Sequence, residues 1–106
     1  GIALQGAQVA VLGLTFKENV PDLRNSKVAD VVAELQRWGV VPRVLDPLAD
    51  HDEAHEEYGI ELVSQEALAE CAAVILAVPH RGLDDVALEL LRGGARVLLD
   101  LRGVVA

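Results

Sequence analysis

The feature that most constrains the fold of this sequence is the alternation of short apolar runs with segments of helical periodicity. Four runs have the length and the Val, Leu and Ile content of buried strands, and turn-forming or charged residues bound each of them. We therefore expect strands at residues 8–13, 41–45, 73–78 and 96–101. The first of these contains Val9-Ala10-Val11-Leu12 and ends at Gly13.

The segments between the expected strands carry helical signals. Residues 26–38 place Val28, Val31, Val32 and Leu35 on one face of a helix, and Gly39 follows as a helix-ending residue. We also expect a short exposed helix within 48–58, a brief extended piece at 60–63, a short helix that starts at Ser64, and a helix from Leu83 to the Gly93-Gly94 pair.

Alternating strands and helices predict a three-layer α/β/α fold of Rossmann-like type, with a mainly parallel sheet. The chain has 106 residues, a length that suits a single domain with a sizeable core. Its composition is 52% hydrophobic with three aromatic residues, which favours buried parallel strands covered by helices over an antiparallel sandwich. We expect one domain that spans residues 1–106.

The connection between the first strand and the first helix is long, about a dozen residues where such loops usually have about 2–6. It carries Lys17 and Arg24, and Asn25 and Ser26 stand where a helix N-cap belongs. Ligands of open α/β sheets bind beyond the carboxyl ends of the strands, where the strand order reverses. If the first and fourth strands are neighbours there, Arg102 joins Lys17 and Arg24 around one crevice. Three cations together with a helix N-terminus suit a diphosphate.

The charge and the cysteine content limit the other partners. A net charge of −8 argues against a general nucleic-acid-binding or membrane-binding surface. A single cysteine, Cys71, cannot form an internal disulfide and fits the reducing cytosol, so we expect a cytoplasmic protein. No apolar run approaches the ~18 residues of a membrane span. The chain begins at Gly1, and we expect it to be a piece of a longer protein.

For four further candidates a structural role is a better interpretation than a catalytic or ligand-binding one. Asp46 ends the second expected strand before Pro47, and a turn is a better role for it than a ribose contact. His51 and His55 have a metal-capable spacing, but a solvated helix face is the better interpretation. Cys71 is expected to be a small buried hydrophobe. His80 could face the crevice, although a surface-loop histidine is the simpler prediction.

Known catalytic and cofactor fingerprints are missing from the sequence. The G-x-G-x-x-G spacing fails after Gly13, and no P-loop is present. The chain therefore resembles a binding module more than a complete catalyst. The alternative is a free-standing acidic α/β domain for nucleotide binding or for signalling. A response-regulator-like module would need acidic residues after the first strand and a phosphoacceptor Asp after the third, where this chain has Leu14-Thr15-Phe16 and Pro79-His80.

Residues 12–28, LGLTFKENVPDLRNSKV, closely resemble the opening of the C-terminal, UDP-binding domain of the UDP-glucose/GDP-mannose dehydrogenase family. The segments Val44-Leu45-Asp46-Pro47, 74–80 and Leu99-Asp100-Leu101-Arg102 agree with that family. The resemblance covers essentially the whole chain, and its Lys-Glu-Asn-x-Pro-Asp-Leu-Arg-Asn-Ser form is most similar to UDP-N-acetyl-hexosamine 6-dehydrogenases.

The resemblance implies a role in polysaccharide biosynthesis, in a homo-oligomeric parent enzyme. That enzyme oxidises the C6 alcohol of a nucleotide sugar to a carboxylate with two NAD⁺ and a covalent cysteine thiohemiacetal. By position in the motif, Phe16, Lys17 and Arg102 would contact the UDP-sugar, and Arg24 would reach NAD⁺ held mainly by an N-terminal domain. The NAD-binding and catalytic-cysteine motifs do not occur here, so this chain alone is expected to be inactive, with no catalytic residue and no metal site of its own.

Overall fold

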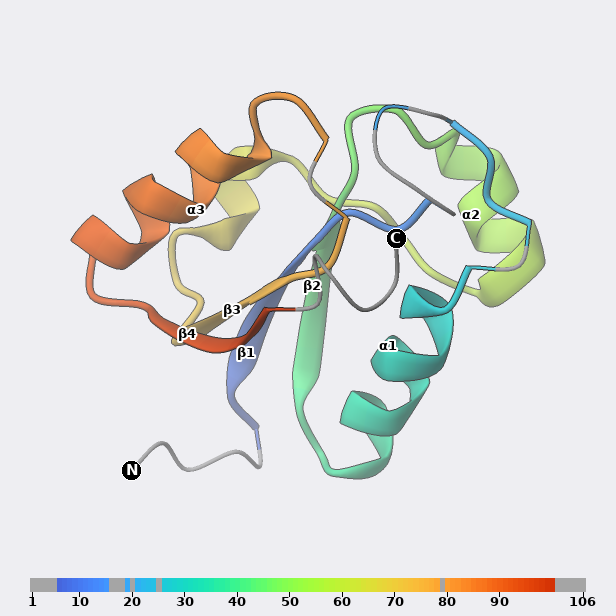
Figure 1. The fold of residues 1–106 in the computed structure, drawn as a ribbon. Coiled ribbons are helices and arrows are strands. Elements are labelled where there is room, and N and C mark those ends of the chain that lie inside the picture. Colours follow the sequence, from blue (N-terminus) through green and yellow to red (C-terminus); the bar gives the residue numbers. More distant parts are fainter. Residues whose placement is uncertain (1–5, 16–18, 20, 25, 79, 101–106) are drawn as a thin grey trace.

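The computed structural model describes residues 6–15, 19, 21–24, 26–78 and 80–100. Four strands form one parallel sheet (Figure 1): β1 (Gln8–Leu12), β2 (Val41–Leu45), β3 (Ala73–Leu76) and β4 (Arg96–Asp100). Their order across the sheet is β2-β1-β3-β4. The predicted α/β class with a parallel sheet is confirmed.

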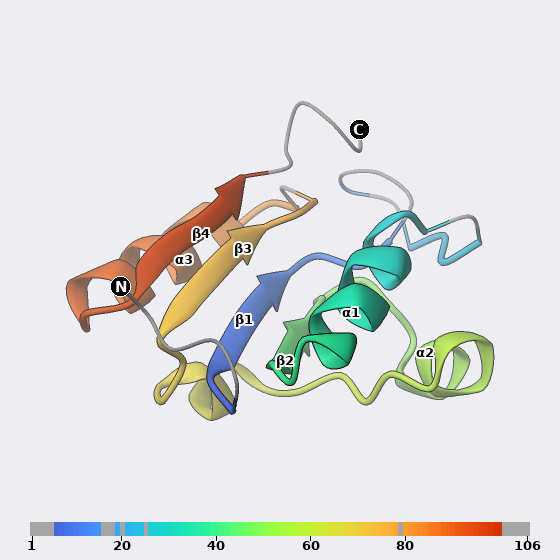
Figure 2. The same cartoon turned by 90° about the horizontal axis from the view of Figure 1, so that it is seen from below.

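Helices cover both faces of this sheet. α1 (Val28–Arg37) and α2 (His51–Tyr58) lie on one side, whereas α3 (Leu83–Arg92) and the 3₁₀ turn η1 (Gln65–Leu68) lie on the other (Figures 1 and 2). Alternate residues of β1 point to opposite faces, so Val9 and Val11 pack in the α1 core and Ala10 and Leu12 pack in the α3 core. None of the described helices is long and apolar enough to cross a lipid bilayer.

The predicted elements all appear, with shifts at their ends. β2 has the predicted bounds, β1 is one residue shorter, β3 ends at Leu76, and β4 ends at Asp100, beside residues outside the described part. The helix predicted from Ser64 is a single 3₁₀ turn, and the extended piece at 60–63 makes one parallel bridge, between Leu62 and Val44. α2 begins at His51 because the Asp50 side chain accepts the Glu53 N–H and caps it.

The expected adjacency of the first and fourth strands is wrong. β1 pairs with β2 and β3, and β4 pairs with β3 among the described strands. β2 lies on one side of β1, and β3 and β4 lie on the other side. The strand order therefore reverses between β1 and β3. The loops that follow these two strands flank the switch point, and the end of β4 lies one strand further away. Neighbouring strands are about 4.8 Å apart, which puts the ends of β1 and β4 roughly 10 Å from each other.

Gly13 allows the chain to leave β1 at this switch point. Its φ is +96°, and a Cβ atom built on it would lie 2.5 Å from the carbonyl oxygen of Val78. Its N–H donates to the Leu45 carbonyl, while the N–H groups of Ala77 and Val78 donate to the Leu12 carbonyl. Gly13 therefore lies between the exits of β2 and β3 with no space for a side chain.

Gly13→Ala should destabilise the domain by about 3 kcal/mol or more, because a left-handed backbone and a backbone clash act together. Gly59→Ala is the matched control, since Gly59 also has a positive φ, of +67°, but no atom lies within 4 Å of its added Cβ. It should cost about 1 kcal/mol. Urea unfolding of the two variants measures the difference, and equal losses would contradict the close approach at Gly13.

Candidate functional site

A buried carboxylate, Asp46, organises the carboxyl edge of the sheet. It follows β2 directly and is 2% exposed. Its Oδ2 accepts the backbone N–H groups of Leu14 (2.6 Å) and Thr15 (3.0 Å), which belong to the loop after β1. Its Oδ1 accepts the N–H groups of Leu48 (2.8 Å) and Ala49 (3.1 Å) in its own turn. One side chain therefore fixes the exits of both strands.

The environment of Asp46 determines its charge. Burial alone would raise the pKa of this carboxyl, but the hydrogen bonds from His80 and from the backbone N–H groups of Leu14, Leu48 and Thr15 outweigh burial and lower the pKa below its usual value. Asp46 is therefore an anion at neutral pH, and its charge is compensated by hydrogen-bond donors that point at it.

His80 brings the third strand exit into the same cluster. It follows β3, is 2% exposed, and its Nε2 lies 2.8 Å from both Asp46 Oδ2 and Thr15 Oγ1. Its Nδ1 accepts the backbone N–H of Asn19 at 2.8 Å. Asn19 has a φ of +60°, which asparagine tolerates better than most residues, and its Oδ1 accepts the Arg81 N–H. We call Thr15, Asn19, Asp46 and His80 the switch-point cluster.

The cluster contains a hydroxyl, an imidazole and a carboxylate, but it is not arranged as a nucleophilic triad. In such a triad the two ring nitrogens of the histidine face the hydroxyl and the carboxylate separately. Here Thr15 and Asp46 both face Nε2, while a backbone amide occupies Nδ1. Thr15 is also 1% exposed, so a substrate cannot reach its hydroxyl. The arrangement holds loops together and does not activate a nucleophile.

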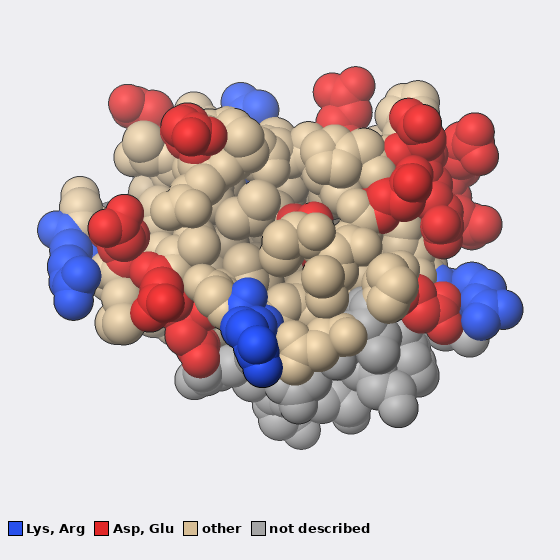
Figure 3. Space-filling model, turned by 90° about the horizontal axis from the view of Figure 1, so that it is seen from above, with Lys and Arg blue, Asp and Glu red and all other residues tan. Residues whose placement is uncertain are grey.

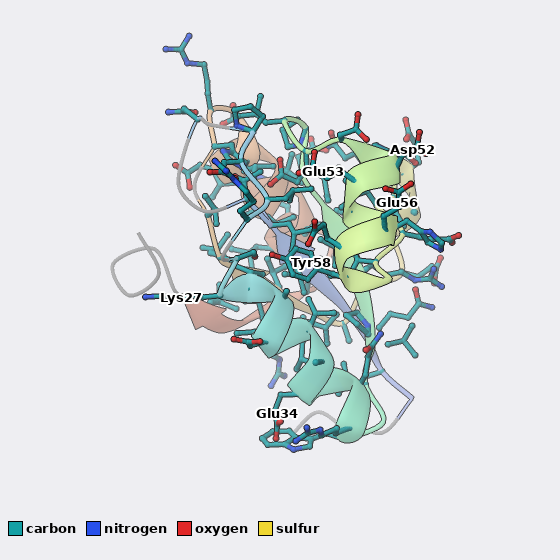
Figure 4. All side chains as sticks on the ribbon, turned by 90° about the vertical axis from the view of Figure 1, so that its right-hand side faces the viewer. Lys27, Glu34, Asp52, Glu53, Glu56 and Tyr58 are labelled. Carbon is teal, nitrogen blue, oxygen red and sulfur yellow. The ribbon has the colours of Figure 1, made fainter. Side chains whose placement is uncertain are left out.

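Two hydroxyl groups connect the end of this loop to the helices. Ser26 Oγ donates to the Leu14 carbonyl and accepts the Ala29 N–H, so it acts in the capping role that the sequence predicts for it. The Tyr58 hydroxyl accepts the Ser26 N–H and donates to the Leu23 carbonyl. Tyr58 lies between α2 and the start of α1, whereas Asp52 and Glu56 point away from the molecule (Figure 4).

Of the four site residues predicted from the sequence, the structure describes one, Arg24. Phe16, Lys17 and Arg102 lie outside the described residues. Arg24 is described, and its guanidinium lies on the exposed carboxylate of Asp22, with 3.2 Å between Nε and Oδ1. This hydrogen-bonded pairing raises the pKa of Arg24 and lowers that of Asp22. Because the Arg24 side chain is 80% exposed, its contact with Asp22 is weakened by solvent and is easily exchanged for another anion.

Two expectations about single residues need correction. His80 is not a surface-loop histidine, because it is buried and bonded through both ring nitrogens. Asp46 forms the predicted turn but also holds the loop after β1, and its two oxygens are occupied by donors from the chain. Cys71 is buried as predicted, and burial raises the pKa of its thiol. His51 and His55 are exposed, and the described residues include no group of three His, Cys, Asp or Glu side chains suited to a metal ion.

Exposed carboxylates are concentrated on α2. On the face seen in Figure 3, acidic side chains gather on the right-hand side, over α2, and a second group lies on the left-hand side, over α3. This helix and its cap contribute five exposed acids: Asp50, Asp52, Glu53, Glu56 and Glu57. An anionic ligand would be repelled there.

Comparisons with known proteins agree with this architecture. A family model described as the UDP binding domain of the UDP-glucose/GDP-mannose dehydrogenase family matches residues 10–106. The chain belongs to this family. UDP-N-acetyl-D-glucosamine 6-dehydrogenase from Salmonella typhi is 40% identical over 99% of the chain, and the enzyme of the same name from Pseudomonas aeruginosa is 42% identical over 95%. The chain spans about a quarter of the length of each, 25% in both cases.

A solved structure shares the fold of this UDP-binding domain. The crystal structure of a ternary complex of GDP-mannose dehydrogenase from Pseudomonas aeruginosa superposes with a TM-score of 0.68 over 96% of the chain and 26% of that protein. The sequence identity is 23%, so the likeness concerns the fold.

Asp46→Asn should lower the free energy of unfolding by about 2–3 kcal/mol at pH 7. The substitution replaces a charged oxygen, which accepts hydrogen bonds, with an NH₂ donor that faces N–H groups. The loss should begin to shrink below a pH of about 3.9, where the carboxyl of the unfolded chain takes up a proton, and should shrink further as the pH falls through the lowered pKa of the folded-state carboxyl. Urea unfolding across this pH range tests both statements. Asp50→Asn is the control, because asparagine caps α2 about as well, and a loss equal to that of Asp46→Asn would refute the special role of Asp46.

Proposed function

We propose that residues 1–106 form the substrate-nucleotide-binding domain of an NAD-dependent nucleotide-sugar 6-dehydrogenase. The parent enzyme oxidises the C6 alcohol of a UDP-sugar to a carboxylate and reduces two NAD⁺, with the cofactor held mainly by another domain of the same protein. The observation that carries this proposal is the long loop after β1. It is anchored at the point where the strand order reverses, within a chain whose family model covers residues 10–106.

The chain's own chemistry supports a binding role. Cys71 is buried behind η1 and α3, and its raised pKa keeps the thiol protonated, which does not suit a nucleophile that forms a thiohemiacetal. The nucleophile and the cofactor pocket therefore belong to other domains of the parent, and the isolated chain has no oxidation chemistry. We further propose that the parent is a cytoplasmic homo-oligomer involved in polysaccharide biosynthesis.

The side chains proposed to bind the ligand come from two loops. Phe16 and Lys17 in the loop after β1, and Arg102 after β4, would contact the UDP-sugar, and Arg24 would reach NAD⁺. The ends of β1 and β4 lie roughly 10 Å apart, a distance that Lys and Arg side chains can span from both sides. The backbone N–H groups of Leu14 and Thr15 already donate to Asp46, which supports side-chain cations as donors for the diphosphate.

Titration of the domain with UDP, followed by NMR, should shift the amide signals of residues 14–26 and 102–103. Binding should be weak, because the other domains supply much of the site. Lys17→Ala should weaken it by about tenfold or more, the value of one charge-assisted contact.

Arg37→Ala is the matched control, since Arg37 is an exposed cation at the far end of α1 that pairs with Glu34. It should leave the titration unchanged. Amide shifts confined to α2, η1 or α3, or equal effects of Lys17→Ala and Arg37→Ala, would contradict the proposed site.

A further inference from the structure

His80 bonds to both sides of the segment proposed to hold the nucleotide. Thr15 lies directly before residues 16–18, and its Oγ1 is 2.8 Å from Nε2 of the ring. Asn19 lies directly after them, and its N–H donates to Nδ1 at 2.8 Å. A single imidazole therefore fixes the distance between the two ends of this segment.

The hydrogen-bond partners determine the tautomer of His80. Nδ1 accepts an N–H, so it carries a lone pair and no proton. The proton of the neutral ring is then on Nε2, where it faces the anionic Oδ2 of Asp46 and the Thr15 hydroxyl. Asp46 thus selects the tautomer that leaves Nδ1 free to accept the Asn19 N–H. The other neutral tautomer would place N–H against N–H at Asn19 and a lone pair against a carboxylate.

Asn19 also accepts a hydrogen bond from the turn that contains His80. Its Oδ1 accepts the Arg81 N–H at 2.9 Å, so the loop after β1 and the residues after β3 exchange hydrogen bonds in both directions. This pair of bonds holds Asn19 at a φ of +60°, a conformation that few other side chains adopt readily. The turn that contains His80 and Arg81 therefore holds Asn19 by two hydrogen bonds.

We propose that His80 is a positioning residue for nucleotide binding, which holds Thr15 and Asn19 in fixed places on either side of residues 16–18, the latter through the bond between Nδ1 and the Asn19 N–H. This inference rests on the proposed function. Its physical basis is a relay in which Asp46 orients the ring, the ring orients Asn19, and Thr15 and Asn19 together define the ends of the ligand-binding segment.

Two substitutions separate the two ring nitrogens. In His80→Asn the amide oxygen stands near the place of Nδ1 and can still accept the Asn19 N–H, while the contact with Asp46 is lost. In His80→Gln the amide lies near the place of Nε2 and can still donate to Asp46, while the Asn19 N–H loses its acceptor. His51→Gln, on the exposed face of α2, is the matched control.

In the absence of ligand, hydrogen exchange of the Asn19 amide should be about tenfold or more faster in His80→Gln than in the wild type, and His80→Asn should restore much of the protection. UDP titration should show at least about fivefold weaker binding for His80→Gln and partial rescue for His80→Asn, even if His80→Asn is the less stable protein. His51→Gln should match the wild type in both measurements.

Three outcomes would overturn the proposal. His80→Gln could bind UDP as the wild type does, the Asn19 amide could keep its protection in that variant, or binding could follow stability alone across the two variants. If the wild type shows no UDP-induced shifts, the proposed function fails for this domain, while the exchange of Asn19 still decides whether His80 holds the loop. If a variant does not fold, ¹⁵N NMR of the wild-type ring decides, because a protonated Nδ1 at neutral pH would exclude the bond.

Discussion

A negative charge buried beneath the carboxyl edge of the sheet determines how the loops at this edge are arranged. Oδ2 of Asp46 accepts N–H groups from the loop after β1, and Oδ1 accepts N–H groups from the turn after β2. His80, which follows β3, bonds to Oδ2 and links the third strand exit to the other two. Such a carboxylate is stable only when every lone pair faces a donor, so the three exits must keep their relative positions. The close approach of Gly13 to Val78 completes the arrangement from the backbone side.

This arrangement has a consequence for anion binding. In dinucleotide-binding folds, the backbone N–H groups after the first strand are directed at the pyrophosphate. Here the N–H groups of Leu14 and Thr15 point at an internal anion, and the Ala29 N–H in the first turn of α1 points at Ser26 Oγ. These three donors of the described residues are used within the chain, which favours Lys and Arg side chains as partners of a diphosphate. This agrees with the absence of the glycine fingerprint and with the proposed roles of Lys17 and Arg102.

The sequence predicts the layers of the fold well because they follow from local periodicity. Val28, Val32 and Leu35 bury the predicted face of α1, and β2 ends where the Asp46-Pro47 turn begins. The order of the strands has no such local signal, and the expected adjacency of the first and fourth strands was wrong for that reason. The roles of Asp46 and His80 were also undervalued. Apart from Leu48 and Ala49 in the turn of Asp46, their partners lie 31–65 residues away in the sequence, and only the folded sheet brings them together. The family resemblance supplied the candidate ligand contacts, whereas the device that positions their loop is visible only in three dimensions.

Asp46 and His80 act as one unit in this structure, and a double-mutant cycle measures the coupling between them. The free energy of unfolding would be measured for the wild type, Asp46→Asn, His80→Leu and the double variant. Because Oδ2 and Nε2 share a buried hydrogen bond, we expect a coupling energy of about 1–3 kcal/mol, so that the second substitution costs much less once the first is present. Additive losses, equal within about 0.5 kcal/mol, would show that the two side chains act independently and would contradict this account.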